Sequence, residues 1–323
     1  MKKFLITIDT EGDNLWQWHK GDNITTECVK YLPRFQNLCE RYGFKPVYLS
    51  NYEMIDDDDY VAFIKDVCRR NCGELGMHLH AWNSPPDYEL PTVRDSQPYL
   101  IEYPVEVMED KIRFITRYIQ ERTGIRPISH RSGRWALNQD YIDLLIKYGY
   151  KVDCSVTPHI DWKYSLGCTE NSQGSNYMNS SEHPYVLKSG SGDGAIWEVP
   201  VTIRICNNGI FKHCHKPMDI AKGIYHIWKK RPYWIRPNGH NLDAMKHVVD
   251  QAQNDNYIMF MLHSSEMMPG GSPNFLDKNS IEKLYDDMEA IFSYLHELKY
   301  EGGTLQEYYY GYGKEIWNDS LVK

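Results

Sequence analysis

The sequence predicts an α/β protein whose strands lie mostly parallel in one sheet. Short apolar runs alternate along the chain with longer segments of helical apolar spacing, a pattern typical of parallel sheets, open or closed into a barrel. A chain of 323 residues can bury a large core, either as one barrel-sized domain or as two smaller ones. Polar residues directly follow several apolar runs, which places them at the sheet edge where such folds carry their chemistry.

The first half of the chain carries clear signals for helix ends. The helix expected over residues 27–42 ends at Gly43, a residue type preferred just past a helix, and Pro33 indicates a kink or a late start. The acidic run Asp56 to Asp59 opens a helix to about Asn71, because acids favour a helix N-terminus. The other elements expected here are strands at 3–8, 45–50, 73–77, 126–129 and 150–154, helices at 105–123 and 138–148, and a Pro-rich loop at 81–104.

The second half is less regular. Many Ser, Gly and Asn residues over about 157–195 indicate a long irregular stretch, whereas the apolar run 257–262 predicts a buried strand that ends at His263. We find no internal repeat and no low-complexity linker, so we expect a single domain over residues 1–323. The remaining elements expected are strands at 197–205 and 303–310 and helices near 217–230, 241–253 and 279–298.

Charge and hydropathy restrict the partners. The formal net charge is −8 and there is no long basic tract, which argues against nucleic acid and anionic membrane as main partners. We interpret the cationic run Lys229-Lys230-Arg231 as a solvated helix end. No run approaches the ~18 apolar residues of a membrane span, and the apolar run after Lys3 is too short for a secretory signal, so a cytoplasmic protein with reduced, packed cysteines is expected.

Two clusters of possible metal ligands follow strands. The carboxylates of Asp9, Glu11 and Asp13 come just after the strand 3–8, and the imidazoles of His78 and His80 come near the end of the strand 73–77. Alternate strand residues point to the same side, so both histidines can face one ion. Carboxylates and neutral imidazoles together make a plausible divalent-metal site.

Further polar residues stand at strand ends in the same way. His130 and Arg131 follow the strand 126–129, Asp153 closes the strand 150–154, and His263 ends the strand 257–262. A strand-end polar residue without function is the alternative for each one singly. Because all of them fall on the same face of an α/β sheet, we expect an active site there.

The chain is rich in aromatic residues, with 25 Tyr and 9 Trp. Flat apolar rings with a polar tip suit sugars, but they also suit cores and interfaces. Trp82 and Trp135 lie in loops just after strand ends, as do Trp16, Trp18 and Trp162, and they could line a sugar groove; loop packing is the alternative for each.

In their order along the chain, these clusters resemble the motifs of the polysaccharide deacetylase family (NodB homology, carbohydrate esterase family 4). The similarity spans roughly residues 3 to 310 and includes five short motifs. They are Thr7-Ile8-Asp9, Glu74-Leu75-Gly76-Met77-His78, Arg131-Ser132-Gly133-Arg134-Trp135, Val152-Asp153-Cys154-Ser155 and Leu262-His263.

The sequence departs from the family pattern at two metal-ligand positions. Thr10 stands where the family has its second Asp, and Glu11 one residue later could replace it. Trp82 stands where the family usually has its second His, and here His80 comes two residues early.

The resemblance implies a distorted (β/α)7-type barrel that binds a divalent ion. Glu11, His78 and His80 would hold the ion, and imidazole ligands favour Zn²⁺. Trp82 and Trp135 would contact the substrate.

The resemblance also implies four catalytic residues. Asp9 would be the general base, provided that desolvation raises its pKa, and Arg131 would orient it. His263 would protonate the leaving amine. Asp153 would hydrogen-bond a catalytic side chain, with His263 the expected partner and a strand-end cap the alternative.

The activity implied is hydrolysis of an amide. We expect a metal-dependent hydrolase that removes an acetyl or formyl group from an amino sugar during surface polysaccharide biosynthesis, with a small nucleotide-linked or a lipid-linked substrate. The alternatives are a hydrolase of a non-sugar C–N amide bond and a catalytically inactive glycan-binding barrel.

Overall fold

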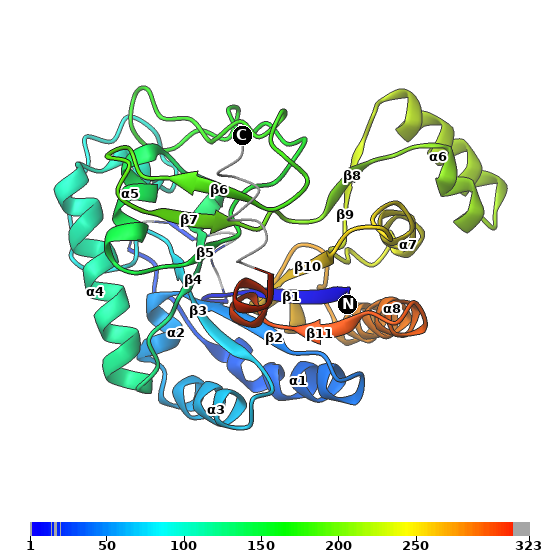
Figure 1. Cartoon of the computed structure of the whole chain (residues 1–323), viewed down its shortest axis with the longest axis horizontal. Coiled ribbons are helices and arrows are strands. Elements are labelled where there is room, and N and C mark those ends of the chain that lie inside the picture. Colours follow the sequence, from blue (N-terminus) through cyan, green and yellow to red (C-terminus); the bar gives the residue numbers. More distant parts are fainter. Residues whose placement is uncertain (1, 14, 16–17, 20, 313–323) are drawn as a thin grey trace.

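The structure of the chain, a computed structural model, describes residues 2–13, 15, 18–19 and 21–312. Its centre is a nine-stranded sheet that curls into a half-barrel, with strand order β10-β1-β2-β3-β4-β5-β7-β6 and β11 as a further neighbour of β1 (Figure 1). Every pair is parallel except β6 with β7. The strands of this sheet are β1 (Lys3–Thr10), β2 (Pro46–Ser50), β3 (Glu74–Leu79), β4 (Ser129–Ser132), β5 (Val152–Asp153), β6 (Tyr185–Lys188), β7 (Ala195–Glu198), β10 (Tyr257–His263) and β11 (Glu301–Gly303).

Helices connect the strands and cover the outside of the curved sheet (Figure 1). The α-helices are α1 (Leu32–Arg41), α2 (Tyr52–Asp56), α3 (Asp58–Arg69), α4 (Val105–Thr123), α5 (Gln139–Lys147), α6 (Pro217–Trp228), α7 (Leu242–Gln251) and α8 (Lys278–Glu297). Short 3-10 helices are η2 (Glu27–Tyr31), η3 (Leu100–Glu102), η4 (Gly133–Trp135), η5 (Asn208–His213) and η6 (Ser264–Met267).

A small antiparallel ribbon, β8 (Ile203–Ile205) with β9 (Pro232–Trp234), lies outside the main sheet. The chain around this ribbon approaches the free side of β10. The Thr202 hydroxyl accepts the backbone N–H of Met259 at 2.8 Å, and the Ile235 carbonyl accepts that of Met261 at 3.2 Å. These bonds partly close the half-barrel, so the distorted barrel expected from the sequence is confirmed.

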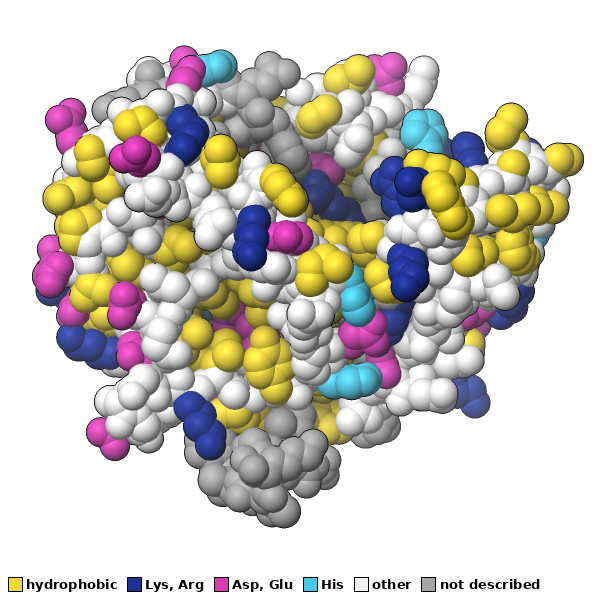
Figure 2. All heavy atoms as spheres, turned by 90° about the horizontal axis from the view of Figure 1, so that it is seen from above, with side chains coloured by type: hydrophobic (Ala, Val, Ile, Leu, Met, Phe, Trp, Pro, Cys, Tyr) yellow, Lys and Arg dark blue, Asp and Glu magenta, His cyan; other side chains and the backbone are white. Residues whose placement is uncertain are grey.

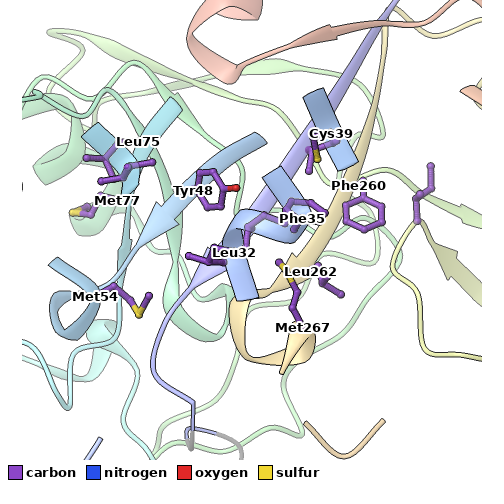
Figure 3. Packing of buried hydrophobic residues seen from close by; sticks show 14 of the residues in the cluster. Leu32, Phe35, Cys39, Tyr48, Met54, Leu75, Met77, Phe260, Leu262 and Met267 are labelled. Atoms are coloured by element: carbon purple, nitrogen blue, oxygen red, sulfur yellow. The ribbon is translucent and has the colours of Figure 1, made fainter. Parts of the chain in front are cut away.

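The main core lies between the sheet and the helices that cover it, α1 to α5, α7 and α8. Figure 3 shows side chains of α1, β2, β3 and β10 that converge there. Phe4 of β1 is central, because its ring meets the edges or faces of Phe44, Phe260 and Phe292 at centroid distances of 4.8, 6.4 and 5.6 Å.

Helix-end signals in the sequence were reliable. Helix α4 has the predicted bounds and ends at Gly124, whose φ of 77° is the left-handed conformation that glycine adopts without strain. The Asp57 side chain caps α3 by accepting the backbone N–H of Tyr60. Pro33 marks a late start, as expected, because η2 precedes α1 and Pro33 lies in the first turn of α1.

Two predicted strands and one predicted irregular region were wrong in part. The strand predicted at 126–129 is Ser129–Ser132, so His130 and Arg131 lie within it. The strand predicted at 197–205 is divided into β7 and β8, because Pro200 has no N–H for a sheet hydrogen bond. The irregular region 157–195 contains one further strand, β6.

The last element was also mispredicted. The strand near 303–310 is only Glu301–Gly303, and residues 305–312 are helical. Thr304 and Glu307 form the reciprocal bonds of a capping box: the Thr304 hydroxyl accepts the Glu307 N–H, and the Glu307 carboxylate accepts the Thr304 N–H. This Thr-x-x-Glu pattern was a readable helix-start signal.

The cysteines and the helices agree with two further expectations. All eight cysteines are free thiols. Within the described part of the chain, no helix is long and apolar enough to cross a membrane.

Candidate metal centre and active site

Strand register brings the predicted polar residues to one end of the sheet. Asp9 of β1 pairs in register with His263 of β10, and His78 of β3 pairs with Arg131 of β4. Glu11 follows β1 directly, and its backbone N–H and C=O both bond to the Ser264 hydroxyl at 3.0 and 2.9 Å. The turn after β1 is thereby tied to the turn after β10.

Glu11, His78 and His80 form a compact cluster of buried ligand atoms. Oε2 of Glu11 lies 2.8 Å from Nε2 of His80 and 3.4 Å from Nε2 of His78, and the two Nε2 atoms are 3.1 Å apart. Among the described residues this is the one group of three or more His, Cys, Asp or Glu side chains close enough to share an ion. The two-residue spacing of the histidines on a strand therefore does place both rings on one face.

The donor set fits a divalent ion. Ligands bound to zinc at about 2.0–2.2 Å lie roughly 3.3–3.5 Å from one another in a tetrahedral site, close to the spacings in this cluster. Nδ1 of His78 lies 2.9 Å from the carbonyl oxygen of Arg131, which can only accept, so the proton is on Nδ1 and a neutral ring turns its Nε2 lone pair to the cluster.

Burial and nearby charges shift the pKa values of all three ligands. Burial would raise the pKa of Glu11, but hydrogen bonds with His78 and His80 hold that pKa well below its usual range. Burial lowers the pKa of His80, so this ring is neutral near pH 7. For His78, the nearby carboxylates of Asp9 and Glu11 outweigh burial and raise the pKa.

A glycine makes room for the second histidine. A Cβ atom at Gly133 would lie 2.5 Å from the Leu79 carbonyl oxygen and 2.8 Å from Nδ1 of His80. Any larger residue would push the His80 ring away from Glu11.

Asp9 is held by Arg131 in a buried ion pair. Nη1 of Arg131 lies 2.6 Å from Oδ1 of Asp9, while Nη2 donates to the Thr7 hydroxyl at 2.9 Å and Nε to the Cys154 carbonyl at 3.1 Å. The predicted partnership of Arg131 with Asp9 is confirmed. The condition set for Asp9 as a base, a pKa raised by desolvation, is not met: burial raises the pKa, but Arg131 and the neighbouring histidines outweigh burial and lower it.

His263 faces the same group from β10. Its Nε2 lies 3.7 Å from Oδ2 of Asp9 and 3.9 Å from Oε1 of Glu11. On the other side of the ring, Nδ1 lies 3.0 Å from Oε2 of Glu266, which also accepts from Arg236 at 3.1 Å. Glu266 is ionised and can only accept, so Nδ1 carries a proton and Nε2 is the atom directed to the site.

The prediction that Asp153 holds His263 is wrong. Oδ1 of Asp153 lies 2.6 Å from Nδ1 of His130, and Oδ2 accepts the backbone N–H of Ser155 at 3.0 Å. Four strands lie between β5 and β10 in the sheet order, and the residue that fixes the His263 ring comes from η6 instead. Asp153 is therefore part of a separate buried network behind Arg131.

The tryptophans divide into two groups. Trp82 stacks on Trp18 at 4.4 Å and lies 5.2 Å from the His80 ring, so it borders the metal ligands. Trp135 is buried, with the Arg131 guanidinium 5.0 Å above its ring and Trp234 at 5.8 Å. Trp16 lies outside the described residues.

Asp13 does not join the carboxylate cluster. Its carboxylate oxygens accept the backbone N–H groups of Glu27 and Cys28 at the start of η2. It has the structural function of a helix cap.

Three residues near the site were missed from the sequence. Glu266 comes three residues after His263, the spacing of a capping box, and that spacing was a readable signal. Arg236 follows a three-residue strand too short to be recognised. Glu53 accepts the Gly12 N–H at 2.7 Å, and burial raises its pKa to about 7.

A cavity of about 670 Å³ lies beside Arg236, which in turn contacts His263 and Glu266. Trp234 and residues of α6 and α7 line other parts of this cavity.

No family model and no curated protein matches this sequence. Several solved structures do. A structure from Parabacteroides distasonis, provisionally named a glycoside hydrolase/deacetylase, is 13% identical, covers 98% of this chain and 71% of its own, and has a TM-score of 0.57. The 4-alpha-glucanotransferase from Thermococcus litoralis is 13% identical over 95% of this chain and 40% of its own, with a TM-score of 0.54. A provisionally named polysaccharide deacetylase from Mycobacterium smegmatis is 16% identical over 94% of each chain, with a TM-score of 0.46.

The fold is thus that of the glycoside hydrolase/deacetylase barrel. At such low identity the likeness shows the fold alone. Because a glucanotransferase has a similar barrel, the fold does not define the reaction. The reaction has to be inferred from the side chains of the site.

We expect protein purified without chelator to contain about one divalent transition-metal ion per chain. His78→Ala and His80→Ala should each lower the metal content strongly, because each removes one of three ligands. The control is His183→Ala, whose side chain is 66% exposed. Elemental analysis measures the content; no stoichiometric metal in the wild type, even after zinc is added, would contradict the site.

Glu266 should make folding sensitive to acid. Burial raises its pKa, but Arg236 and His263 outweigh burial and lower it to about 2. A carboxylate with a depressed folded-state pKa stabilises the protein above its unfolded pKa of about 4.3, and this stabilisation is lost as the pH falls toward the folded value. Lowering the pKa by roughly two units corresponds to about 3 kcal/mol in the free energy of unfolding.

The test compares the unfolding free energy of wild type and Glu266→Gln by denaturant titration between about pH 6 and pH 2. The difference in unfolding free energy between wild type and Glu266→Gln should become smaller as the pH falls. Glu89 is exposed, so Glu89→Gln is the control, and its unfolding free energy should equal that of wild type at every pH. A difference that is independent of pH would show that Glu266 does not titrate in this way.

Proposed function

We propose that this protein is a metal-dependent hydrolase that removes an acetyl or formyl group from an amino sugar. The observation that supports this most strongly is the meeting of Glu11, His78 and His80 with two further ionisable groups, Asp9 and His263, at one sheet edge. Amide hydrolysis needs an activated carbonyl, a base and an acid, and this edge offers a residue for each role.

Glu11, His78 and His80 would hold the ion, and two imidazole ligands favour Zn²⁺. When bound, such an ion polarises a carbonyl and lowers the pKa of water. The Arg131 carbonyl keeps the His78 ring oriented, and Gly133 leaves space for the His80 ring.

Asp9 is the proposed general base. Its lowered pKa keeps it ionised at neutral pH, as a base must be, although it makes the carboxylate a weaker base. Arg131 engages Oδ1, so Oδ2, which faces His263, is the oxygen available to accept a proton.

His263 is the proposed general acid. Glu266 accepts from Nδ1 and fixes the ring, so that a proton on Nε2 would point toward Asp9 and Glu11. Protonation at this atom would let the leaving amine depart. Glu266 and Arg236 act through His263 and are positioning residues.

The substrate is proposed to be a nucleotide-linked or lipid-linked intermediate of surface polysaccharide synthesis. Trp82 borders the ligands and offers a flat ring for a sugar, and the cavity beside Arg236 can receive the remainder. Buried Trp135 supports Arg131 and has little free surface for a sugar. The cytoplasmic location and the single domain remain predictions.

Asp9→Asn should abolish release of acetate or formate from acylated amino sugars while leaving the metal content intact, and the uncompensated Arg131 charge should lower the free energy of unfolding. The amide has the shape of the carboxylate but cannot accept the proton, and loss of a placed base costs about 10²–10⁴ in rate. Exposed Asp193→Asn is the matched control and should keep full activity. Wild-type turnover in Asp9→Asn would exclude Asp9 as the base.

His263→Ala should slow turnover with little change in metal content, and the basic limb of the pH–rate profile should disappear, because that limb reports the acid. His183→Ala is again the control. Persistence of both limbs, or loss of metal with the ring, would make His263 a structural residue or a ligand. A wild-type protein that binds glycans and metal but turns nothing over would favour the inactive barrel.

A further inference from the structure

Helix α6 is exposed in a way that no other long helix of the described chain is. Of its twelve residues only Gly223 is buried, whereas the twenty residues of α8 include eight buried ones. Figure 1 shows α6 projecting from the body of the molecule beyond β8, β9 and α7.

The inner face of α6 is its polar one. Gly223 lets the helix backbone approach η5, since a Cβ there would lie 3.1 Å from Phe211 and 3.3 Å from Ile210. His226 bonds to the Tyr233 hydroxyl of β9, and Asp219 and His226 line the cavity beside the active site. The helix is therefore attached to the protein by its small and polar side chains.

The outer face of α6 is apolar. Ile220, Ile224 and Trp228 recur at four-residue spacing and so form one stripe, with Met218 and Tyr225 on its flanks. Trp228 is 71% exposed, Met218 65% and Ile224 58%. Figure 2 shows hydrophobic side chains gathered at the end of the molecule that α6 occupies, with Lys and Arg side chains beside them. In a globular protein, the apolar face of a surface helix ordinarily packs against the core and its polar face is exposed to solvent.

Positive charge frames this apolar face. Lys216 precedes the helix, and Lys229, Lys230 and Arg231 follow it, all exposed. The ammonium of Lys229 lies 4.2 Å above the Trp228 ring. The protein as a whole carries a net charge of −8, so this basic frame is a local feature.

We propose that the apolar face of α6, formed by Met218, Ile220, Ile224, Tyr225 and Trp228, docks on the surface of a lipid bilayer that contains anionic lipids. Isoleucine and tryptophan side chains would enter the boundary between headgroups and acyl chains, and the flanking lysines and arginine would contact lipid phosphates. Lys229-Lys230-Arg231 is a solvated helix end, as expected from the sequence, with lipid phosphates as the proposed partners of these side chains.

A second copy of the chain fits this face less well. A helix of twelve residues is about 18 Å long, so one face offers a few hundred Å² at most, well below the roughly 800 Å² per partner of a stable interface. Both ends of the helix are basic, so a symmetric contact would also bring like charges together.

Docking in this way would hold the cavity near the membrane but behind α6, because the same helix lines that cavity with its opposite face. If the proposed function holds, a lipid-linked amino sugar is then the substrate class that this geometry favours over a freely diffusing one. The docking itself does not depend on any catalytic activity.

Vesicle co-sedimentation of the full-length protein tests the proposal. The probes are vesicles of phosphatidylcholine alone and of phosphatidylcholine with about one third phosphatidylglycerol. Wild type should bind the anionic vesicles at least about tenfold more tightly, and binding should weaken with salt. The double variant Ile224→Glu/Trp228→Glu should lose this binding, and Lys229→Glu/Lys230→Glu should lose the preference for anionic lipid.

The matched control is Val93→Glu/Tyr164→Glu, which places the same charges at two exposed apolar residues far from α6 in the sequence and should bind like wild type. Circular dichroism and metal content confirm that each variant folds, and Asp9→Asn should bind vesicles normally, which separates docking from catalysis. Wild type that ignores both vesicles, or a lipid-free dimer that Ile224→Glu/Trp228→Glu dissociates, would overturn the proposal.

Discussion

The ion pair between Arg131 and Asp9 holds the centre of this protein together. β1 and β4 are not neighbours in the sheet, since β2 and β3 lie between them, so the Arg131 side chain crosses the inside of the curved sheet to reach Asp9. The same guanidinium bonds to Thr7 of β1 and to the backbone after β5. Both charges are buried, and removing one partner of such a pair costs about 3–5 kcal/mol, because the other charge remains without compensation.

This ion pair contributes both to the stability of the fold and to the geometry of the candidate active site. It sets the position of the proposed base, and the backbone carbonyl of the same arginine orients the His78 ring. Behind it lies a second buried network, in which His130 pairs with Asp153, and burial together with Asp153 raises the pKa of Glu198 well above its usual range. A protonated Glu198 can lie beside Asp153 without adding a second negative charge.

The sequence was informative wherever a signal was local. Residue spacing predicted most of the strands and helices, and the alternation of His78 and His80 on a strand predicted that they share a face. Helix bounds were accurate where a glycine or a capping side chain marks the end, as at Gly124 and Asp57.

Some errors were missed local signals, as at Glu266 and Thr304, and others concern contacts between segments far apart in the sequence. Position at a strand end alone favoured Asp153 as the partner of His263, and only the strand order excludes it. The direction of the pKa shift of Asp9 likewise depended on how closely Arg131 approaches it. The outward apolar face of α6 was hidden because a helical pattern shows that a face is apolar but not which way it points.

The strand order also has a consequence for how the protein folds. The proposed metal ligands belong to the first eighty residues and lie on or just after β1 and β3, each of which pairs with β2 between them. Pairing of β1 with β10, by contrast, joins segments such as those of Glu11 and Ser264, which are 253 residues apart. Closing so long a loop is slow, so the ligand-bearing strands can assemble on a ribosome-bound chain well before the segment that carries His263 has been synthesised.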